Sequence, residues 1–125
     1  MSKDVRILMT EDDSLQQELM GIFLDQDGYT LCVVNNGQEA IDEIEKESFD
    51  LIILDLVMPV MGGLDFLQWL RNERHDETPV LVLTAVKSYS ERREAINAGA
   101  NKVLVKPFST SSFIDEVDVL LASVS

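Results

Sequence analysis

The stretch LIILD, residues 51–55, decides the fold class. Its four apolar residues follow one another without alternation, which is typical of a strand buried on both faces, as in a parallel sheet. Runs of the same kind occur at residues 5–9, 31–34, 80–83 and 103–105. The sequence therefore predicts five short strands of one parallel sheet.

Helical patterns separate these runs. Their apolar positions are Leu15, Leu19, Ile22 and Phe23; Ala40, Ile41 and Ile44; Leu64, Leu67 and Leu70; Ala95 and Ile96; and Phe113, Val117, Leu120, Leu121 and Val124. We expect Asp13 or Ser14 to cap the first helix and Thr110 to cap the last. Strands that alternate with helices predict right-handed crossovers, with helices on both faces of the sheet.

The length and composition indicate one domain. The chain has 125 residues, of which 46% are hydrophobic, enough to bury a core and to exclude global disorder. We find no linker, repeat or low-complexity stretch, and the last predicted helix reaches the end of the sequence. The expectation is a single domain over residues 1–125 with no output domain.

The charge balance argues against some partners. The chain carries 23 acidic and 10 basic residues, a formal net charge of −13, which disfavours direct nucleic-acid binding. No apolar stretch reaches the length of a membrane span, and the N-terminus lacks the apolar core of a signal peptide. The only cysteine, Cys32, lies in an apolar run, which fits the reducing cytoplasm.

Acidic, hydroxyl or basic side chains follow four of the five predicted strands, whereas the uncharged Asn35 and Asn36 follow the second. The acidic, hydroxyl and basic residues are Glu11, Asp12 and Asp13 after the first strand, Asp55 after the third, Thr84 after the fourth and Lys106 after the fifth. The carboxyl ends of parallel strands meet at one edge of the sheet, where open α/β folds bind their ligands. We therefore expect these side chains to share one site.

The electrostatics of such a site favour a cation. Two carboxylates about 4 Å apart repel each other by roughly 4 kcal/mol at an effective dielectric constant near 20. The acids must therefore protonate, spread apart or hold a cation, and a partly hydrated pocket of oxygen ligands suits Mg²⁺.

Asp55 is the expected nucleophile, because it would end a central strand between the acidic cluster and Thr84. A carboxylate can attack phosphorus to give an acyl phosphate. Lys106 and the Thr84 hydroxyl could then bind the oxygens of the transferred group.

At these residues the chain resembles the receiver domain of two-component response regulators, the CheY-like family. The resemblance extends from Val5 to Leu121 and rests on four motifs in a fixed order. They are ILMTED at residues 7–12, DLVMPVMGG at 55–63, LTA at 83–85 and KPF at 106–108. It implies a flavodoxin-like sheet of strand order 2-1-3-4-5 with five helices.

The resemblance also implies roles for the site residues. Asp55 matches the aspartate that accepts a phosphoryl group from a sensor histidine kinase or a histidine phosphotransfer protein. Glu11 and Asp12 match the acidic pair that holds Mg²⁺, together with Asp55 and the backbone carbonyl of Val57. Asp13 lies one place beyond that pair and is interpreted as a flanking residue.

Two further matches concern the phosphoryl oxygens and the loop after the last strand. Thr84 and Lys106 match the residues that bind the oxygens of the phosphoryl group. Lys106-Pro107 matches a peptide bond that is often cis in the family. The implied protein is a phosphoacceptor that catalyses only its own modification and signals by a change of shape.

The chain departs from the family pattern at several positions. Val103 stands where many members carry Tyr or Phe, so a switch based on an aromatic ring is unavailable. Val57 and Val86 are apolar at positions beside the path of the hydrolytic water, which predicts slow self-dephosphorylation. Basic residues gather near the fourth helix and fifth strand, at Lys87, Arg92, Arg93 and Lys102, and could form a docking face for an acidic output partner or a second copy.

Three alternatives compete with this interpretation. A phosphatase of the haloacid dehalogenase type would need a second aspartate where Val57 stands, and usually a cap domain. A flavodoxin-like cofactor binder would need a hydroxyl-rich loop after the first strand, whereas the residues there are acidic. The last alternative is a degenerate receiver that acts as an unphosphorylated scaffold, and the full set of site residues argues against it.

Overall fold

The computed structural model describes residues 5–11, 13–56, 61–85 and 89–122. Over these residues strands and helices alternate, as the sequence predicts. The strands are β1 (Arg6–Thr10), β2 (Thr30–Val34), β3 (Leu51–Asp55), β4 (Val80–Thr84) and β5 (Lys102–Val105). The helices are α1 (Ser14–Gln26), α2 (Gly37–Lys46), α3 (Gly63–Gln68), α4 (Tyr89–Ala98) and α5 (Thr110–Ala122), and α3 continues into a π-helical turn, η1 (Trp69–Glu73).

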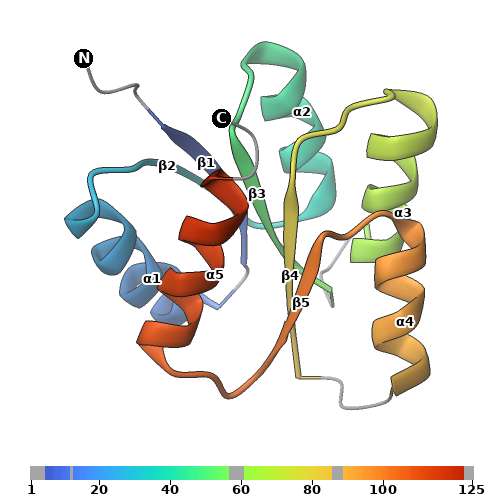
Figure 1. Ribbon diagram of the computed structural model, residues 1–125. Coiled ribbons are helices and arrows are strands. Elements are labelled where there is room, and N and C mark those ends of the chain that lie inside the picture. The colour runs from blue at the N-terminus through green and yellow to red at the C-terminus, as the bar shows by residue number, and fades with distance from the viewer. Residues whose placement is uncertain (1–4, 12, 57–60, 86–88, 123–125) are drawn as a thin grey trace.

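The five strands form one parallel sheet in the order β2-β1-β3-β4-β5 (Figure 1). This confirms the predicted α/β class and strand order. The chain first winds outward from β1 to β2 and then in the opposite direction from β3 to β5. The winding therefore reverses beside β1 and β3, and this is the place where open α/β sheets bind ligands.

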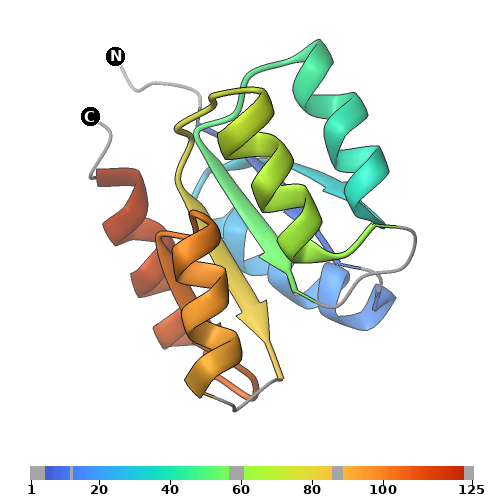
Figure 2. The ribbon, with the colours of Figure 1, turned by 90° about the vertical axis from the view of Figure 1, so that its right-hand side faces the viewer.

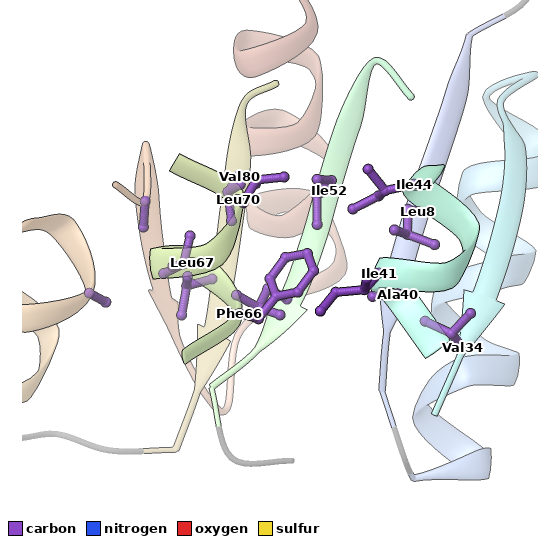
Figure 3. Packing of buried hydrophobic residues seen from close by; sticks show 14 residues of the cluster. Leu8, Val34, Ala40, Ile41, Ile44, Ile52, Phe66, Leu67, Leu70 and Val80 are labelled. Carbon is purple, nitrogen blue, oxygen red and sulfur yellow. The ribbon is translucent and has the colours of Figure 1, made fainter. Parts of the chain in front are cut away.

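The two faces of the sheet are covered by different helices (Figures 1 and 2). Helices α1 and α5 pack on the face that presents Ile7, Met9 and Ile53. Helices α2, α3 and α4 pack on the opposite face with Leu8 and Ile52, as Figure 3 shows for part of this core. Since both faces are covered, every residue of β3 and β4 is buried, which explains the apolar runs without alternation.

Helix α1 is present where the sequence predicts it, but it packs through a different face from the one that the pattern suggests. Leu15, Leu19 and Ile22 are 64%, 44% and 49% exposed, whereas Met20 and Leu24 are buried against the sheet. Apolar residues surround much of this helix, so the spacing alone offers two stripes. Contact with the sheet and α5 selects between them.

The helix caps follow the expected chemistry with one correction. The Asp13 carboxylate accepts a hydrogen bond from the Leu15 N–H at 3.0 Å, which confirms one of the two candidates for capping α1. Thr110 was expected to cap α5 but is its first helical residue. The cap is Ser109, whose hydroxyl accepts from the Ser112 N–H at 3.1 Å.

Candidate functional site

The predicted site residues within the described part of the chain lie at the carboxyl edge of the sheet. The register pairs Thr10 with Leu54, so Glu11 at the end of β1 lies level with Asp55 at the end of β3. Asp55 is in turn paired with Leu83, which places Thr84, the last residue of β4, one residue beyond that level at the same edge. Parallel pairing therefore brings residues far apart in sequence to a single rim.

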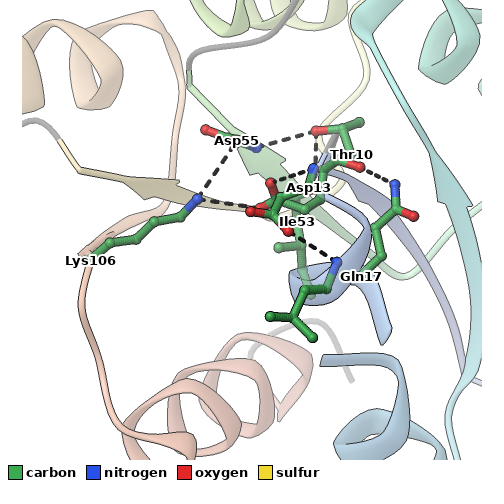
Figure 4. A network of polar contacts seen from close by, with 8 residues as sticks. Thr10, Asp13, Gln17, Ile53, Asp55 and Lys106 are labelled. Carbon is green, nitrogen blue, oxygen red and sulfur yellow. Dashed lines mark hydrogen bonds and ion pairs between the residues drawn. The ribbon is translucent and has the colours of Figure 1, made fainter. Parts of the chain in front are cut away.

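One ammonium group joins two carboxylates at this rim. Lys106 Nζ lies 3.3 Å from Glu11 Oε2 and 3.4 Å from Asp55 Oδ2 (Figure 4). Glu11 is 1% exposed and Asp55 is 7% exposed, whereas the Lys106 side chain keeps 23% of its surface. The structure thus brings these three predicted residues together, with the carboxylates withdrawn from water and the lysine open to it.

The pKa values of two of these groups reflect this proximity. Burial, and then the charge of Asp55, raise the pKa of Glu11, although Lys106 acts in the opposite direction. Burial alone would lower the pKa of Lys106, but the carboxylates of Asp55 and Glu11 outweigh it and raise that pKa. Lys106 is therefore a fixed positive charge at neutral pH.

Thr10, which is not among the predicted site residues, holds the backbone of Asp55. Its buried hydroxyl accepts a hydrogen bond from the Asp55 N–H at 3.2 Å and donates to the Ile53 carbonyl at 3.4 Å. The sequence does carry a signal for this role, because Thr10 places a hydroxyl at the end of an apolar strand, directly before the acidic pair.

A second set of contacts positions Glu11. The Asp13 N–H donates to Glu11 Oε1 at 3.3 Å, and the Gln17 side-chain amide donates to the Glu11 carbonyl. The same amide donates to Asn35 Oδ1 at 3.1 Å, which ties the ends of β1 and β2 together. Asp13 itself is exposed and caps α1, and its interpretation as a flanking residue stays a prediction.

The ends of β4 and β5 complete the rim. Thr84 is fully buried, and its carbonyl accepts a hydrogen bond from the Lys106 N–H at 2.7 Å. The Lys106-Pro107 peptide bond is cis, as the family pattern suggests. Phe108 stacks on Phe113 of α5 with ring centroids 5.8 Å apart, which anchors this loop to the helix.

Several predicted positions lie outside the described residues. They are Asp12 and Val57 of the expected metal site, Val86 beside the expected water path and Lys87 of the basic region. Over the described ranges, no group of three His, Cys, Asp or Glu side chains is placed to hold a metal ion. The described part of the rim supplies two of the expected carboxylates, Glu11 and Asp55.

This fold and rim define a class of signalling protein. Residues 7–118 match the family described as the response regulator receiver domain. The chain belongs to this family, whose members act in two-component systems. The expected class and the CheY-like resemblance are thereby confirmed.

Relatives of known sequence and structure agree with this assignment. The chain is 38% identical to the response regulator MprA of Mycolicibacterium vanbaalenii over 117 residues. The aligned part is 94% of this chain and 50% of MprA. The chain is similar to the receiver domain of the Francisella response regulator 1452, with a TM-score of 0.92 and 28% identity over 98% of this chain and 100% of that one. It is also similar to the chemotaxis response regulator CheY4 of Vibrio cholerae, with a TM-score of 0.87 and 29% identity. That alignment covers 94% of this chain and 99% of CheY4.

The curated relatives are longer than this chain. The chain spans about half the length of the curated response regulators that it matches. Among the helices formed by the described residues, none has the length and apolar character needed to cross a membrane.

Proposed function

We propose that Asp55 accepts a phosphoryl group and that the resulting acyl phosphate switches the protein between two conformations. The observation that carries this proposal is the Lys106 ammonium, shared between Asp55 and Glu11 at the open edge of the sheet. A buried carboxylate beside a fixed cation is suited to receive a group that brings more negative charge.

The proposed step is an in-line transfer from a phosphohistidine. An Asp55 carboxylate oxygen attacks phosphorus, a new P–O bond forms, and the P–N bond breaks with its electron pair passing to the imidazole. Lys106 then pairs with an oxygen of the transferred group, to which Thr84, at the end of the neighbouring strand, offers its hydroxyl. The donor is a sensor histidine kinase or a histidine phosphotransfer protein.

The residues of the rim fit a magnesium ion. Glu11 and Asp55 present two buried carboxylates to one lysine, so the described acids alone exceed the positive charge beside them. We propose that Glu11, Asp12, Asp55 and the Val57 carbonyl hold Mg²⁺, which neutralises charge on the transferring phosphoryl oxygens when bound.

The same proposal sets the wider role. The protein modifies only itself and turns over no separate substrate, and it passes the signal to an output protein through the basic region of Arg92, Arg93 and Lys102. We place it in the cytoplasm because its one cysteine, Cys32, fits a reducing compartment. A haloacid dehalogenase activity remains the enzymatic alternative and is disfavoured by the valine at position 57.

Intact-mass spectrometry after incubation with acetyl phosphate and Mg²⁺ tests the proposal. The wild-type protein is expected to gain one phosphoryl group, and Asp55→Asn or added EDTA should abolish the gain. Asp65→Asn is the matched control, because Asp65 is an exposed carboxylate in the first turn of α3.

Failure of the wild type to gain mass leads to a second measurement, an NMR titration with beryllofluoride. If the titration also leaves the spectrum unchanged, the protein is a scaffold and the proposal is wrong. A decay series on the phosphorylated protein tests the predicted slow dephosphorylation, which a lifetime of seconds would contradict.

A further inference from the structure

The side-chain amide of Gln17 joins three elements at the carboxyl edge of the sheet. Gln17 lies near the start of α1, and its Nε2 atom donates back to the Glu11 carbonyl at the end of β1 (Figure 4). The same atom donates to Oδ1 of Asn35, which follows β2, at 3.1 Å. A primary amide has two N–H donors, so these two contacts use both of them.

The bond to the Glu11 carbonyl acts on the acidic pair of the proposed metal site. That carbonyl belongs to the peptide unit that links Glu11 to Asp12. Because a peptide unit is planar, holding its carbonyl fixes the plane from which the chain continues to the second acid. The N–H of Glu11 is held as well, since it donates to the Val34 carbonyl at 3.1 Å. Gln17 therefore completes the support of the backbone around Glu11.

The second acceptor of Gln17 is itself fixed by α2. The backbone N–H and the side-chain amide of Asn35 donate to Glu39 Oε1 at 3.0 and 3.4 Å. Glu39 is tied to the cap of α2, because its N–H donates to Asn36 Oδ1 at 2.9 Å. The Gln17 amide therefore rests on an anchored partner, and rotating it away would break a bond on each side.

Rigid support of one peptide unit matters more for Mg²⁺ than for Ca²⁺. Mg²⁺ requires nearly octahedral ligands at about 2.0–2.1 Å, whereas Ca²⁺ accepts oxygen ligands at about 2.3–2.6 Å in flexible arrangements. A loosened acidic pair can still surround the larger ion, but it presents its oxygens less often at the shorter distance. Groups that hold metal ligands without touching the ion commonly change the affinity of a site.

We propose that Gln17 is a positioning residue that gives the metal site its preference for Mg²⁺ over Ca²⁺. It acts through the peptide unit between Glu11 and Asp12 and does not bind the ion. Its amide is neutral, so its effect is on the geometry of the acids and not on their charge. The inference rests on the proposed function, because it takes Glu11 and Asp12 as the residues that hold the ion.

Calorimetric titration of the unphosphorylated protein with MgCl₂, and separately with CaCl₂, tests the proposal. Gln17→Met removes both donors and keeps the length and charge of the side chain. We expect the affinity for Mg²⁺ to fall by about tenfold and that for Ca²⁺ by about twofold. The preference for Mg²⁺ should therefore fall by about fivefold, whereas a general structural defect weakens both ions alike.

Two further variants show whether the effect passes through the described contacts. Gln38→Met is the matched control, because Gln38 is exposed and its amide donates to Asp42 within α2 at 3.3 Å. It should bind both ions as the wild type does. Asn35→Ala removes one acceptor of Gln17 and should weaken Mg²⁺ binding by about threefold. Added to Gln17→Met it should cause no further loss, because the two residues act together.

The outcomes distinguish a failure of this inference from a failure of the proposed function. Equal Mg²⁺ affinities in the wild type and Gln17→Met, or equal losses for the two ions, overturn the role of Gln17 and leave the metal site standing. A wild type that binds no Mg²⁺ at millimolar concentration overturns the metal site and this inference with it. Thermal unfolding establishes that each variant folds. If Gln17→Met does not, Asn35→Ala decides, because it must weaken Mg²⁺ binding more than Ca²⁺ binding.

Discussion

The Thr10 hydroxyl illustrates how a single buried atom can position a side chain that it does not touch. It bonds the backbone of Asp55 on one side and the Ile53 carbonyl on the other. Both bonds lie at the end of β3, where regular ladder pairing stops. The hydroxyl therefore fixes the direction in which the Asp55 side chain leaves the strand.

Replacing Thr10 with valine should slow phosphorylation of Asp55. The two side chains have nearly the same shape, so the main loss is a pair of buried hydrogen bonds, worth about 1–2 kcal/mol of stability. We expect the rate of phosphoryl gain from acetyl phosphate to fall by about threefold to tenfold, which corresponds to about 1 kcal/mol of misplaced geometry.

Thr10→Ser is the matched control, because it keeps the hydroxyl and removes only a methyl group. Its rate should stay near that of the wild type, even if its stability falls. Rates measured well below both unfolding temperatures separate positioning from stability. A serine variant slower than the valine variant would contradict the positioning role.

At this scale the sequence predicted which residues would gather, and the structure brings Glu11, Asp55 and Lys106 together. The chemical roles of these residues stay predictions. Thr10 escaped notice because a threonine at the end of a strand is ordinary, and only the register of β1 against β3 shows what its hydroxyl reaches.

The junction between η1 and β4 shows how elements are joined at the opposite end of the sheet. The Asp76 carboxylate accepts from the Thr78 N–H at 2.9 Å and from the Thr78 hydroxyl at 2.6 Å. The Arg71 guanidinium donates to the carbonyls of Asp76, Thr78 and Gly99. Gly99 has a φ of 121°, and a Cβ there would lie 2.5 Å from Arg71 Cγ, so glycine is required for this contact.

Asp76 should make stability depend on pH at the acidic end of the range. Burial raises its pKa, but the Thr78 hydrogen bonds and the charges of Arg74 and Arg71 outweigh burial and lower it from 3.8. A lowered folded-state pKa means that the contribution is complete above the unfolded value and is lost as the pH falls through the folded one.

We therefore expect Asp76→Asn to cost about 1 kcal/mol at pH 7, where a charge-assisted bond becomes a neutral one. The difference from the wild type should shrink once the pH falls below about 4, near the ordinary value for aspartate. Urea unfolding at a series of pH values measures this difference in stability. Asp25→Asn is the control, because Asp25 is exposed. A difference that stays constant down to pH 3 would contradict the assignment.

The strands could be predicted from the sequence more closely than the faces and ends of the helices. The five apolar runs gave strands that differ from the observed bounds by one residue at most, because a doubly covered sheet leaves no polar face to confuse the pattern. The prediction of which face of α1 is buried was wrong. Leu15 and Met20 are both apolar, and only packing against the sheet and α5 decides which of them is buried. The predicted cap of α5 was Thr110, whereas the structure shows Ser109. Thr110 is surrounded by three serines, at positions 109, 111 and 112, so several residues of the sequence could serve as the cap.

The whole molecule carries a net charge of −13, yet its cations are placed unevenly. Lys106 lies between two carboxylates at the rim, whereas Lys102 at the start of β5 pairs with Glu116. The two lysines belong to the same strand region and have the same charge. They therefore allow the effect of net charge to be separated from that of position.

Removal of Lys106 should strengthen magnesium binding at the proposed site. Lys106→Met takes away a cation that shares the same carboxylates, and we expect about a tenfold gain in Mg²⁺ affinity by calorimetric titration. Lys102→Met gives the same net charge and should change the affinity by less than about twofold, as expected for a screened distant charge. Equal gains in both variants would mean that net charge alone controls binding.

The complete burial of β3 and β4 separates the chemistry of the protein from its external surfaces. Asp55 and Thr84 are carried by strands that are buried along their whole length, while α1 and α4 present exposed faces to solvent. Substitutions on those faces can change what the protein contacts without disturbing Asp55 and Thr84. Changing what such a protein recognises and changing what its rim can do are therefore separable tasks, because they fall on different residues of one scaffold.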